Sequence, residues 1–129
     1  MQVGTHRNQK ETTPTLLELV LRLEGRFRRN LEPIRVTPLQ AGVLLFLHRH
    51  AEANLTDTAA ALCVRQPTLS AVMKDLVRKR WVTKRRSVAD ARILHLRLSR
   101  RGDALVQKIA EQVRQVRTQI TDKIVAKQK

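Results

Sequence analysis

The sequence contains very little cysteine, few aromatic residues and no long hydrophobic run. Its only cysteine, Cys63, excludes an internal disulfide and gives no metal-site spacing. No apolar stretch approaches the roughly 20 residues that cross a bilayer. Residues 1–13 lack the apolar centre of a secretory signal. We therefore expect a soluble, cytoplasmic protein in a reducing compartment.

Acidic residues are also scarce. The sequence has 26 Lys and Arg against 11 Asp and Glu, which gives a formal net charge of +15. The segment from Arg65 to Arg101 contains twelve basic residues and only two acidic ones, Asp75 and Asp90, so its formal net charge is +10. A surface whose charges serve only solubility would mix positive and negative residues more evenly. The concentration of positive charge therefore indicates an anionic partner.

The length and the hydrophobic content predict one globular domain. The chain has 129 residues, of which 42% are hydrophobic, enough to bury a core. Residues 1–13 are polar and unpatterned, which predicts a mobile tail. Because residues 14–129 contain no repeat and no Gly/Ser-rich linker, we expect them to form a single domain.

Two long amphipathic helices are predicted towards the ends of the chain. Helical spacing of apolar residues indicates one helix at about 14–31, with Pro14 in its first turn, and another at about 99–127, capped by Ser99. Nothing after the last helix folds back to cover its apolar stripe, and the first helix exposes more apolar surface than a monomer needs. We expect a homodimer through the residues of both stripes: Leu16, Val20, Leu23, Ile109, Val113, Val116, Ile120 and Ile124.

Three shorter helices are predicted between these two. Thr37 caps a core helix that has Pro38 at its first position. Thr56 is expected to cap a short alanine-rich helix, and Gln66 to cap a helix over 67–80. One face of that helix carries apolar residues at helical spacing: Leu69, Val72, Met73 and Leu76.

After Arg80 the apolar spacing changes from the helical period to an alternation. The stretches "WVTKRR" and "RILHLRLS" flank "SVAD", which predicts two short antiparallel strands joined by a charged loop. A short capped helix, a tight turn, a second helix and a hairpin follow one another. This order is typical of a winged helix-turn-helix, with the helix-turn-helix at about 55–80 and the wing at about 81–98. The predicted fold class is mainly α (α+β).

The segment "LTDTAAALCVRQPTLSAVMKDLVRKRWVTKRR", the Asp90-x-Arg92 pattern and "LHLRLSRRG" resemble the MarR family of bacterial transcriptional regulators. The family pattern combines a helix-turn-helix, a basic strand, an Asp-x-Arg wing, a Leu-x-Leu strand and a Ser-x-x-Gly helix start. Two positions depart from it, because Cys63 and Arg80 stand where the family usually has glycine. We expect side chains or mild backbone strain to sustain both turns.

The resemblance implies that the helix over 67–80 lies in a DNA major groove and that the wing meets the minor groove. It assigns DNA contacts on the helix to Arg65, Gln66, Thr68, Ser70, Ala71, Lys74 and Arg78. It assigns wing contacts to Lys84, Arg85, Arg86, Asp90 and Arg92, with the Asp90 carboxylate holding the Arg92 side chain in place. A merely solvated helix and a salt-bridged surface loop are the alternatives.

These observations predict a sequence-specific regulator of double-stranded DNA, a homodimeric repressor on a palindromic operator. The alternatives are a non-specific architectural nucleic-acid-binding protein and a protein-interaction adaptor on the same scaffold. An enzyme is not predicted, because the sequence has no nucleophile–base pair, carboxylate pair or glycine-rich phosphate loop.

The sequence predicts neither a cofactor nor a metal site. His48 and His50 are two residues apart and point in different directions on a helix, which makes them a poor metal pair. Cys63 is expected to be a small buried residue in a turn rather than an oxidant sensor. The resemblance also implies a small-molecule effector, but the aromatic residues Phe27, Phe46 and Trp81 do not identify it.

Overall fold

The computed structural model describes the backbone of residues 15–128 and the side chains of residues 15–121. The predicted tail at 1–13, Pro14 and the side chain of Ile124 therefore lie outside the described residues. The elements follow in the order α2 (Leu16–Leu31), a 3-10 helix (Glu32–Ile34), α3 (Pro38–Arg49), β1 (Ala53–Asn54), α4 (Leu55–Ala61), α5 (Gln66–Arg78), β2 (Val82–Arg86), β3 (Leu94–Leu98) and α6 (Arg100–Gln128). The predicted fold class, mainly helical with a small antiparallel sheet, is confirmed.

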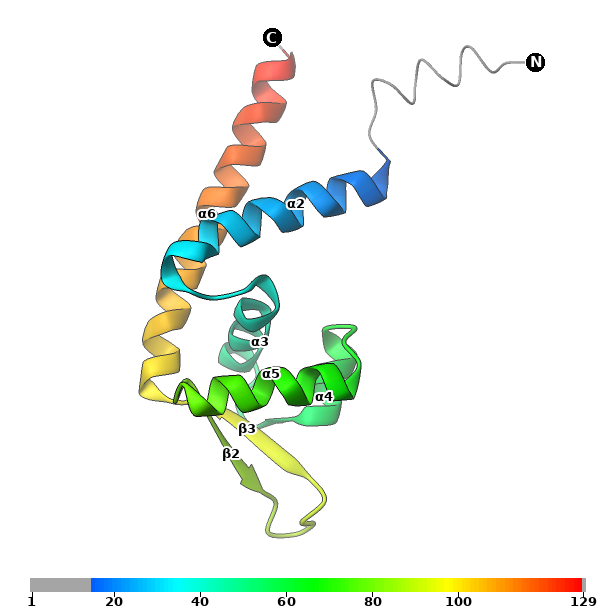
Figure 1. Ribbon diagram of the computed structural model, residues 1–129, viewed down its shortest axis with the longest axis vertical. Coiled ribbons are helices and arrows are strands. Elements are labelled where there is room, and N and C mark those ends of the chain that lie inside the picture. The colour runs from blue at the N-terminus through cyan, green and yellow to red at the C-terminus, as the bar shows by residue number, and fades with distance from the viewer. Residues whose placement is uncertain (1–14, 129) are drawn as a thin grey trace, which may run out of the picture.

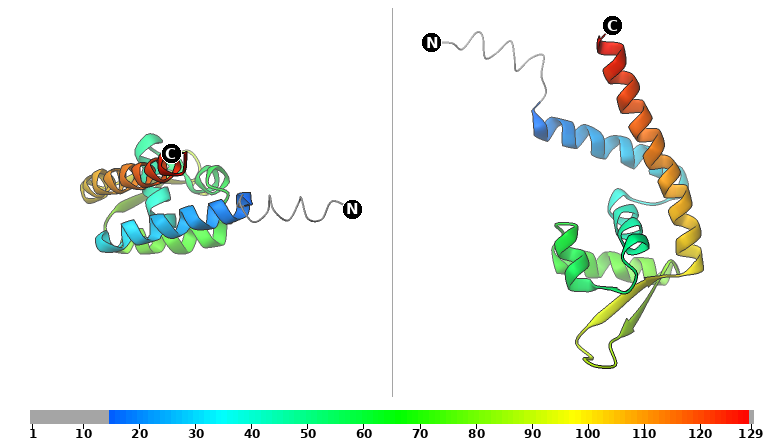
Figure 2. Two further views of the ribbon diagram at one scale, coloured as in Figure 1. Left: turned by 90° about the horizontal axis from the view of Figure 1, so that it is seen from above. Right: turned by 180° about the vertical axis from the view of Figure 1, so that it is seen from behind.

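The long helix α6 runs along most of the molecule, with the β2–β3 hairpin projecting at the end opposite its C-terminus (Figures 1 and 2). Helix α3 packs against α6, α5 packs against α3, and α4 packs against α5. The C-terminal end of α2 packs on the middle of α6, where Asn30 donates to Gln112 and Arg26 donates to Gln119. From there the first half of α2 and the last part of α6 diverge, so each extends beyond the globular body (Figure 1).

The helix starts follow from capping chemistry, with two corrections to the predicted caps. Thr37 caps α3 as predicted, in a reciprocal pair of hydrogen bonds with Gln40. Asn54, not Thr56, caps α4, because the Asn54 side-chain oxygen accepts the amide of Asp57 at 2.7 Å. Thr56 is consequently a residue of the first turn of α4.

The start of α5 also differs from the prediction. The helix begins at Gln66, so Gln66 is helical, Pro67 is the second helical residue and Arg65 occupies the cap position. No side-chain hydrogen bond caps α5. Because Pro67 has no amide hydrogen, one of the unpaired donors of a helix start is absent here, which lessens the need for a cap.

The sheet has three antiparallel strands in the order β1-β3-β2. The predicted hairpin is confirmed, with Val82 opposite Leu98 and Lys84 opposite Leu96. The strand β1 was not predicted, because two residues are too few to show an alternation. It pairs Ala53 with Leu96 and so joins the wing to the segment that precedes the helix-turn-helix.

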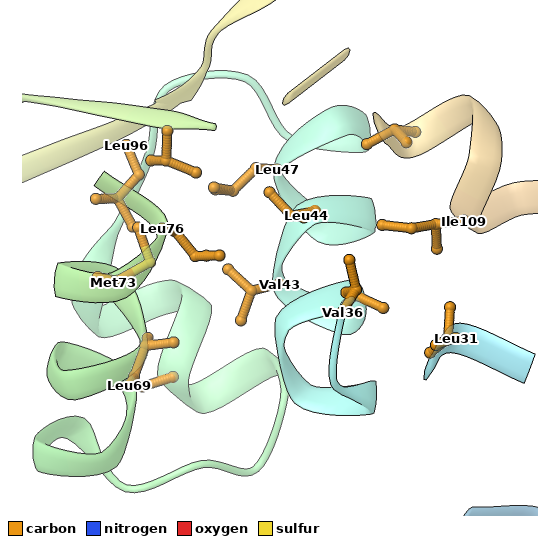
Figure 3. Close-up of a cluster of buried hydrophobic side chains, with 14 residues drawn as sticks. Leu31, Val36, Val43, Leu44, Leu47, Leu69, Met73, Leu76, Leu96 and Ile109 are labelled. Carbon is orange, nitrogen blue, oxygen red and sulfur yellow. The ribbon is translucent and has the colours of Figure 1, made fainter. Parts of the chain in front are cut away.

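The hydrophobic core lies between α3, α5, the sheet and the first half of α6 (Figure 3). The predicted apolar face of α5 is buried at Leu69, Met73 and Leu76, and Val72 is half-buried. Burying one such side chain contributes about 1.5–3 kcal/mol. This face fixes which side of α5 points outwards.

The expectation that nothing covers the apolar stripe of α6 is wrong for two of its residues. Ile109 is 0% exposed and Val116 is 1% exposed within the single chain. Figure 3 shows Ile109 directed towards Leu44, Val36 and Leu31. Ile109 and Val116 are therefore core residues, covered by helices that precede them in the chain.

The other residues assigned to a dimer interface differ in exposure. Val113 and Ile120 are half-buried. On α2, Leu16 is 78% exposed, Val20 52% and Leu23 37%. The unpartnered apolar surface therefore belongs mainly to the first half of α2.

A joint at the start of α6 connects this helix to the end of α5. Arg80 adopts a positive φ of 63°, the conformation that its position in place of glycine required. Its carbonyl accepts the Ser99 hydroxyl at 2.5 Å, and the Ser99 amide donates to the carbonyl of Trp81 at 3.0 Å. Ser99 also caps α6 as predicted, because its hydroxyl accepts the amide of Gly102.

We expect Gly102→Ala to destabilise the protein by about 3 kcal/mol, the upper end of the cost of overpacking. A Cβ atom at Gly102 would lie 2.1 Å from the carbonyl oxygen of Trp81, so backbone would have to move. Gly42→Ala in α3 is the matched control, because a Cβ there meets nothing within 4 Å and alanine favours a helix. Urea unfolding of both variants measures the difference, and equal stabilities would contradict the close approach at the joint.

Candidate nucleic-acid interface

The outer face of α5 is polar and exposed. Arg65, Gln66, Thr68, Ala71, Lys74 and Arg78 are exposed, and Ser70 is half-buried. The buried positions Leu69, Met73 and Leu76 hold the helix against the core, so the residues between them must face solvent. The structure therefore brings six of the seven predicted helix residues onto an accessible surface.

Two residues of this face have partners within the chain. The Gln66 amide donates to the hydroxyl of Thr56 on α4 at 3.5 Å, a long hydrogen bond that leaves the Gln66 side-chain oxygen free to accept. Arg78 forms an ion pair with Asp75, one turn earlier on the exposed side of the helix. The contact between Thr56 and Gln66 was not predicted, because the start of α4 was misplaced by two residues.

The turn between α4 and α5 corrects the prediction for Cys63. This residue is exposed rather than buried, and its φ of 54° lies in the left-handed region. The turn closes by backbone hydrogen bonds, in which the amides of Cys63 and Val64 donate to the carbonyls of Ala60 and Ala59. Its neighbours Leu62 and Val64, rather than Cys63, pack against the hydrophobic core.

The wing loop holds Arg92 by two kinds of contact. The Asp90 carboxylate accepts the Arg92 guanidinium at 3.1 and 3.3 Å and also accepts the Arg92 amide at 3.0 Å. These hydrogen bonds lower the pKa of the Asp90 carboxyl, which therefore stays ionised at neutral pH. The predicted contact between the acid and the arginine is present, and the Arg92 side chain remains 91% exposed.

The rest of the wing presents positive charge on both sides of the hairpin. Lys84, Arg85 and Arg86 are all exposed. Arg86 donates to the carbonyl of Ala91 at 2.9 Å, which ties β2 to the loop. In an antiparallel hairpin, side chains of alternate residues point to opposite faces, so Lys84 and Arg86 share one face and Arg85 lies on the other.

Arg97 was counted in the basic cluster but was not assigned to the site. It lies opposite Thr83 in the β2–β3 ladder, on the same face as Arg85. The alternation in "LHLRLS" shows only that Arg97 lies on the same face of β3 as His95, two residues earlier. That His95 lies opposite Arg85 follows only from the strand register, which cannot be read from the sequence.

Neither histidine of α3's C-terminal region joins a metal-ligand cluster. His48 lies 3.7 Å from the carboxylate of Asp103, and the ring of His50 lies against that of Phe46. Among the described side chains, residues 15–121, no group of three or more His, Cys, Asp or Glu could hold a metal ion. None of the helices described is both long enough and apolar enough to span a membrane.

Comparison with known proteins identifies a family for the helix-turn-helix and the wing. A model of the MarR family matches residues 36–93, from the start of α3 to the end of the wing loop. Among curated proteins, nothing matches the chain.

Solved structures of similar fold include two complexes with DNA. The S. aureus MepR–DNA complex is 21% identical, with a TM-score of 0.76 over 82% of this chain and 79% of that one. A mutant E. coli MarR complexed with operator DNA is 22% identical, with a TM-score of 0.77 over 89% and 85%. The apo form of wild-type E. coli MarR is 22% identical, with a TM-score of 0.78 over 86% and 85%. At these identities the likeness shows the fold.

Proposed function

Because this chain is a MarR-family winged-helix protein, we propose that it is a sequence-specific transcriptional regulator that binds double-stranded DNA as a homodimer. The observation that carries the proposal is the common exposure of the polar face of α5 and of Arg92 on the wing. Helix α5, which has a suitable width for a major groove, and the β2–β3 hairpin, which presents Arg92, thus belong to one exposed surface.

The chemistry of these residues suits base and backbone contacts. The Gln66 carboxamide offers both a donor and an acceptor, as adenine in a major groove requires. Lys74 and Arg78 lie farther along α5, where they suit phosphate groups. The Asp90 carboxylate restricts the Arg92 side chain before DNA arrives, which lowers the entropy cost of inserting it into a minor groove. The complexes of MepR and MarR with DNA support this assignment by fold.

The proposed homodimer forms through the first half of α2. Six large hydrophobic residues there are between 37% and 78% exposed: Leu16, Leu17, Leu19, Val20, Leu21 and Leu23. A contiguous apolar surface of this kind is uncommon on a monomer. A two-fold dimer would present two copies of α5, and we propose that they bind the half-sites of a palindrome about one helical turn apart, on the order of 10 base pairs. Bound there, the dimer would repress by excluding polymerase.

Sequence specificity is tested by sequencing the genomic fragments that the protein retains and then competing one against random DNA. Retention of a common palindrome that random DNA displaces poorly supports a regulator. Equal competition by random DNA would instead indicate an architectural protein, and failure to retain any DNA would indicate an adaptor.

Gln66→Ala should relax the preference for one base pair in each half-site. A good base contact contributes about 1–3 kcal/mol of discrimination at its base, and the loss of an uncharged side chain should leave the salt dependence unchanged. Arg92→Ala should instead weaken binding to all core sequences and reduce the logarithmic salt slope by about one. Binding titrations over single-base operator variants at two salt concentrations separate these two outcomes.

Two controls accompany these variants. Gln66→Glu keeps the shape but replaces the donor of the amide, so it should lose preference for adenine. Asp90→Asn keeps Arg92 charged while weakening the ion pair, so it should reduce affinity less than Arg92→Ala. If Gln66→Ala and Arg92→Ala lower affinity equally on operator and random DNA, α5 is only an electrostatic surface.

A further inference from the structure

The wing sheet carries a charged hollow that includes two of the predicted wing contacts, Lys84 and Arg85, together with residues not assigned to the interface. Six residues of β2, β3 and the turn before β1 line it: Glu52, Thr83, Lys84, Arg85, His95 and Arg97. Three of them are cations and one is an acid. The hollow is open to solvent, and it lies on the β2–β3 hairpin, whose loop carries Arg92.

The strand register explains why two arginines meet here. Arg85 lies opposite His95, and Arg97 lies opposite Thr83, so the arginines are diagonal neighbours on one face of the ladder. Diagonal positions are about 7–8 Å apart at the backbone, which is within reach of two long side chains. Glu52 is the turn residue immediately before β1, and its carboxylate lies near both arginines.

Glu52 contacts both arginines, but only loosely. Its carboxylate oxygens lie 3.8 Å from Arg85 and 3.5 Å from Arg97, beyond good hydrogen-bond distance. The side chains of Arg85 and Arg97 remain 75% and 68% exposed. Exposed ion pairs of this kind contribute little, so a stronger anion can take the place of the carboxylate.

The backbone at Glu52 indicates that this arrangement is held rather than incidental. Glu52 has a φ of 64°, a left-handed conformation that a glutamate adopts at some cost. Its carbonyl lies 3.0 Å from Nδ1 of His95; because a carbonyl only accepts, this ring nitrogen carries the hydrogen. The hydrogen bond ties the turn to β3 and fixes the carboxylate over the two arginines.

We propose that this face is a phosphate-binding site, in which the guanidinium groups of Arg85 and Arg97 hold one phosphate group and displace the Glu52 carboxylate. A planar guanidinium fork matches phosphate oxygens, and phosphate carries more charge than the carboxylate it replaces. The Glu52 carboxylate keeps the guanidinium groups of Arg85 and Arg97 close together when no phosphate is bound. It also weakens binding, because phosphate has to compete with it.

The phosphate group has two sources that share this chemistry, the DNA backbone and a free phosphate. The minor groove is only about 6 Å wide, so a hairpin that inserts its tip there has backbone phosphates beside its strands. With DNA as the source, the site deepens the proposed function and rests on it. With free phosphate, the site is independent of DNA binding.

The free-phosphate test uses the whole protein and inorganic phosphate at constant ionic strength. Backbone amide signals of Arg85 and Arg97 in two-dimensional NMR spectra should shift saturably as phosphate replaces chloride. Glu52→Gln should tighten the apparent Kd by about threefold, the scale of a surface ion pair. Arg97→Gln should weaken it by about tenfold, as the loss of a charged hydrogen bond does. Arg117→Gln, an exposed arginine on α6, should change nothing.

The DNA test compares Arg97→Gln with Arg117→Gln on an operator fragment, because both remove one exposed positive charge. A fall of about one in the logarithmic salt slope for Arg97→Gln alone assigns the bound phosphate to DNA. Saturable phosphate shifts with equal DNA binding by the two variants assign it to a free phosphate. No saturable shift together with equal DNA binding overturns the site. If wild-type protein binds operator and random DNA equally, the proposed regulator fails, while the phosphate titration still decides the site.

Discussion

Raising the salt concentration from 50 to 200 mM should weaken operator binding by about 10³-fold, provided that about six phosphates are contacted. Each phosphate that a lysine or arginine neutralises releases condensed counterions, and this release becomes less favourable as salt rises. The local balance of +10 between Arg65 and Arg101 supplies enough exposed cations for such a contact. Fluorescence anisotropy of a labelled operator over this salt range measures the slope.

Variants that lack two positive charges each identify the residues responsible for this salt dependence. The double variant Lys84→Gln, Arg86→Gln removes two exposed charges from one face of the wing and should reduce the slope by about two. The matched double variant Arg114→Gln, Arg117→Gln removes two exposed charges from α6 and should leave the slope unchanged. A wild-type slope near zero would show that the basic cluster does not face DNA.

Replacing Ile109 with glutamate should abolish the folded state rather than merely separate a dimer. Ile109 is fully buried within one chain and lies against α3 and the end of α2 (Figure 3). Removing its side chain costs about 2–5 kcal/mol, and an unpaired buried charge adds several more. The sum approaches the whole stability of a typical domain, about 5–15 kcal/mol. Circular dichroism should show loss of helix at 25 °C.

Val20→Glu is the informative partner of this variant, since Val20 is half exposed on α2. It should keep the helical spectrum but sediment as a monomer of 14.8 kDa, where the wild type sediments at twice that mass. Ile109→Val should stay folded at a cost of about 0.5–1.5 kcal/mol. A folded, monomeric Ile109→Glu variant would instead place Ile109 on the dimer interface.

Much of the fold follows from short-range patterns in the sequence. The spacing of Leu69, Met73 and Leu76 defined the buried face of α5, and with it the outward face. The change to alternation after Arg80 predicted the hairpin, and the Thr37–Pro38 signal placed the start of α3. These predictions hold because helical and extended periods depend only on neighbouring residues. The predicted cap at Thr56 was wrong because Asn54, two residues earlier, caps α4, and the predicted cap at Gln66 was wrong because α5 already begins at Gln66 and has no side-chain cap.

The tertiary structure decided matters that join residues distant in sequence. The sequence of an apolar stripe does not show whether the same chain or a second chain covers it. Only the packing of α2 and α3 showed that Ile109 and Val116 lie in the core. Likewise, only the register of three strands brought Glu52 to Arg85 and Arg97, which are 33 and 45 residues later in the chain. The sequence determined which faces are apolar or charged, because this depends on local spacing. Which of those faces meet depends on the packing free energy of the whole chain.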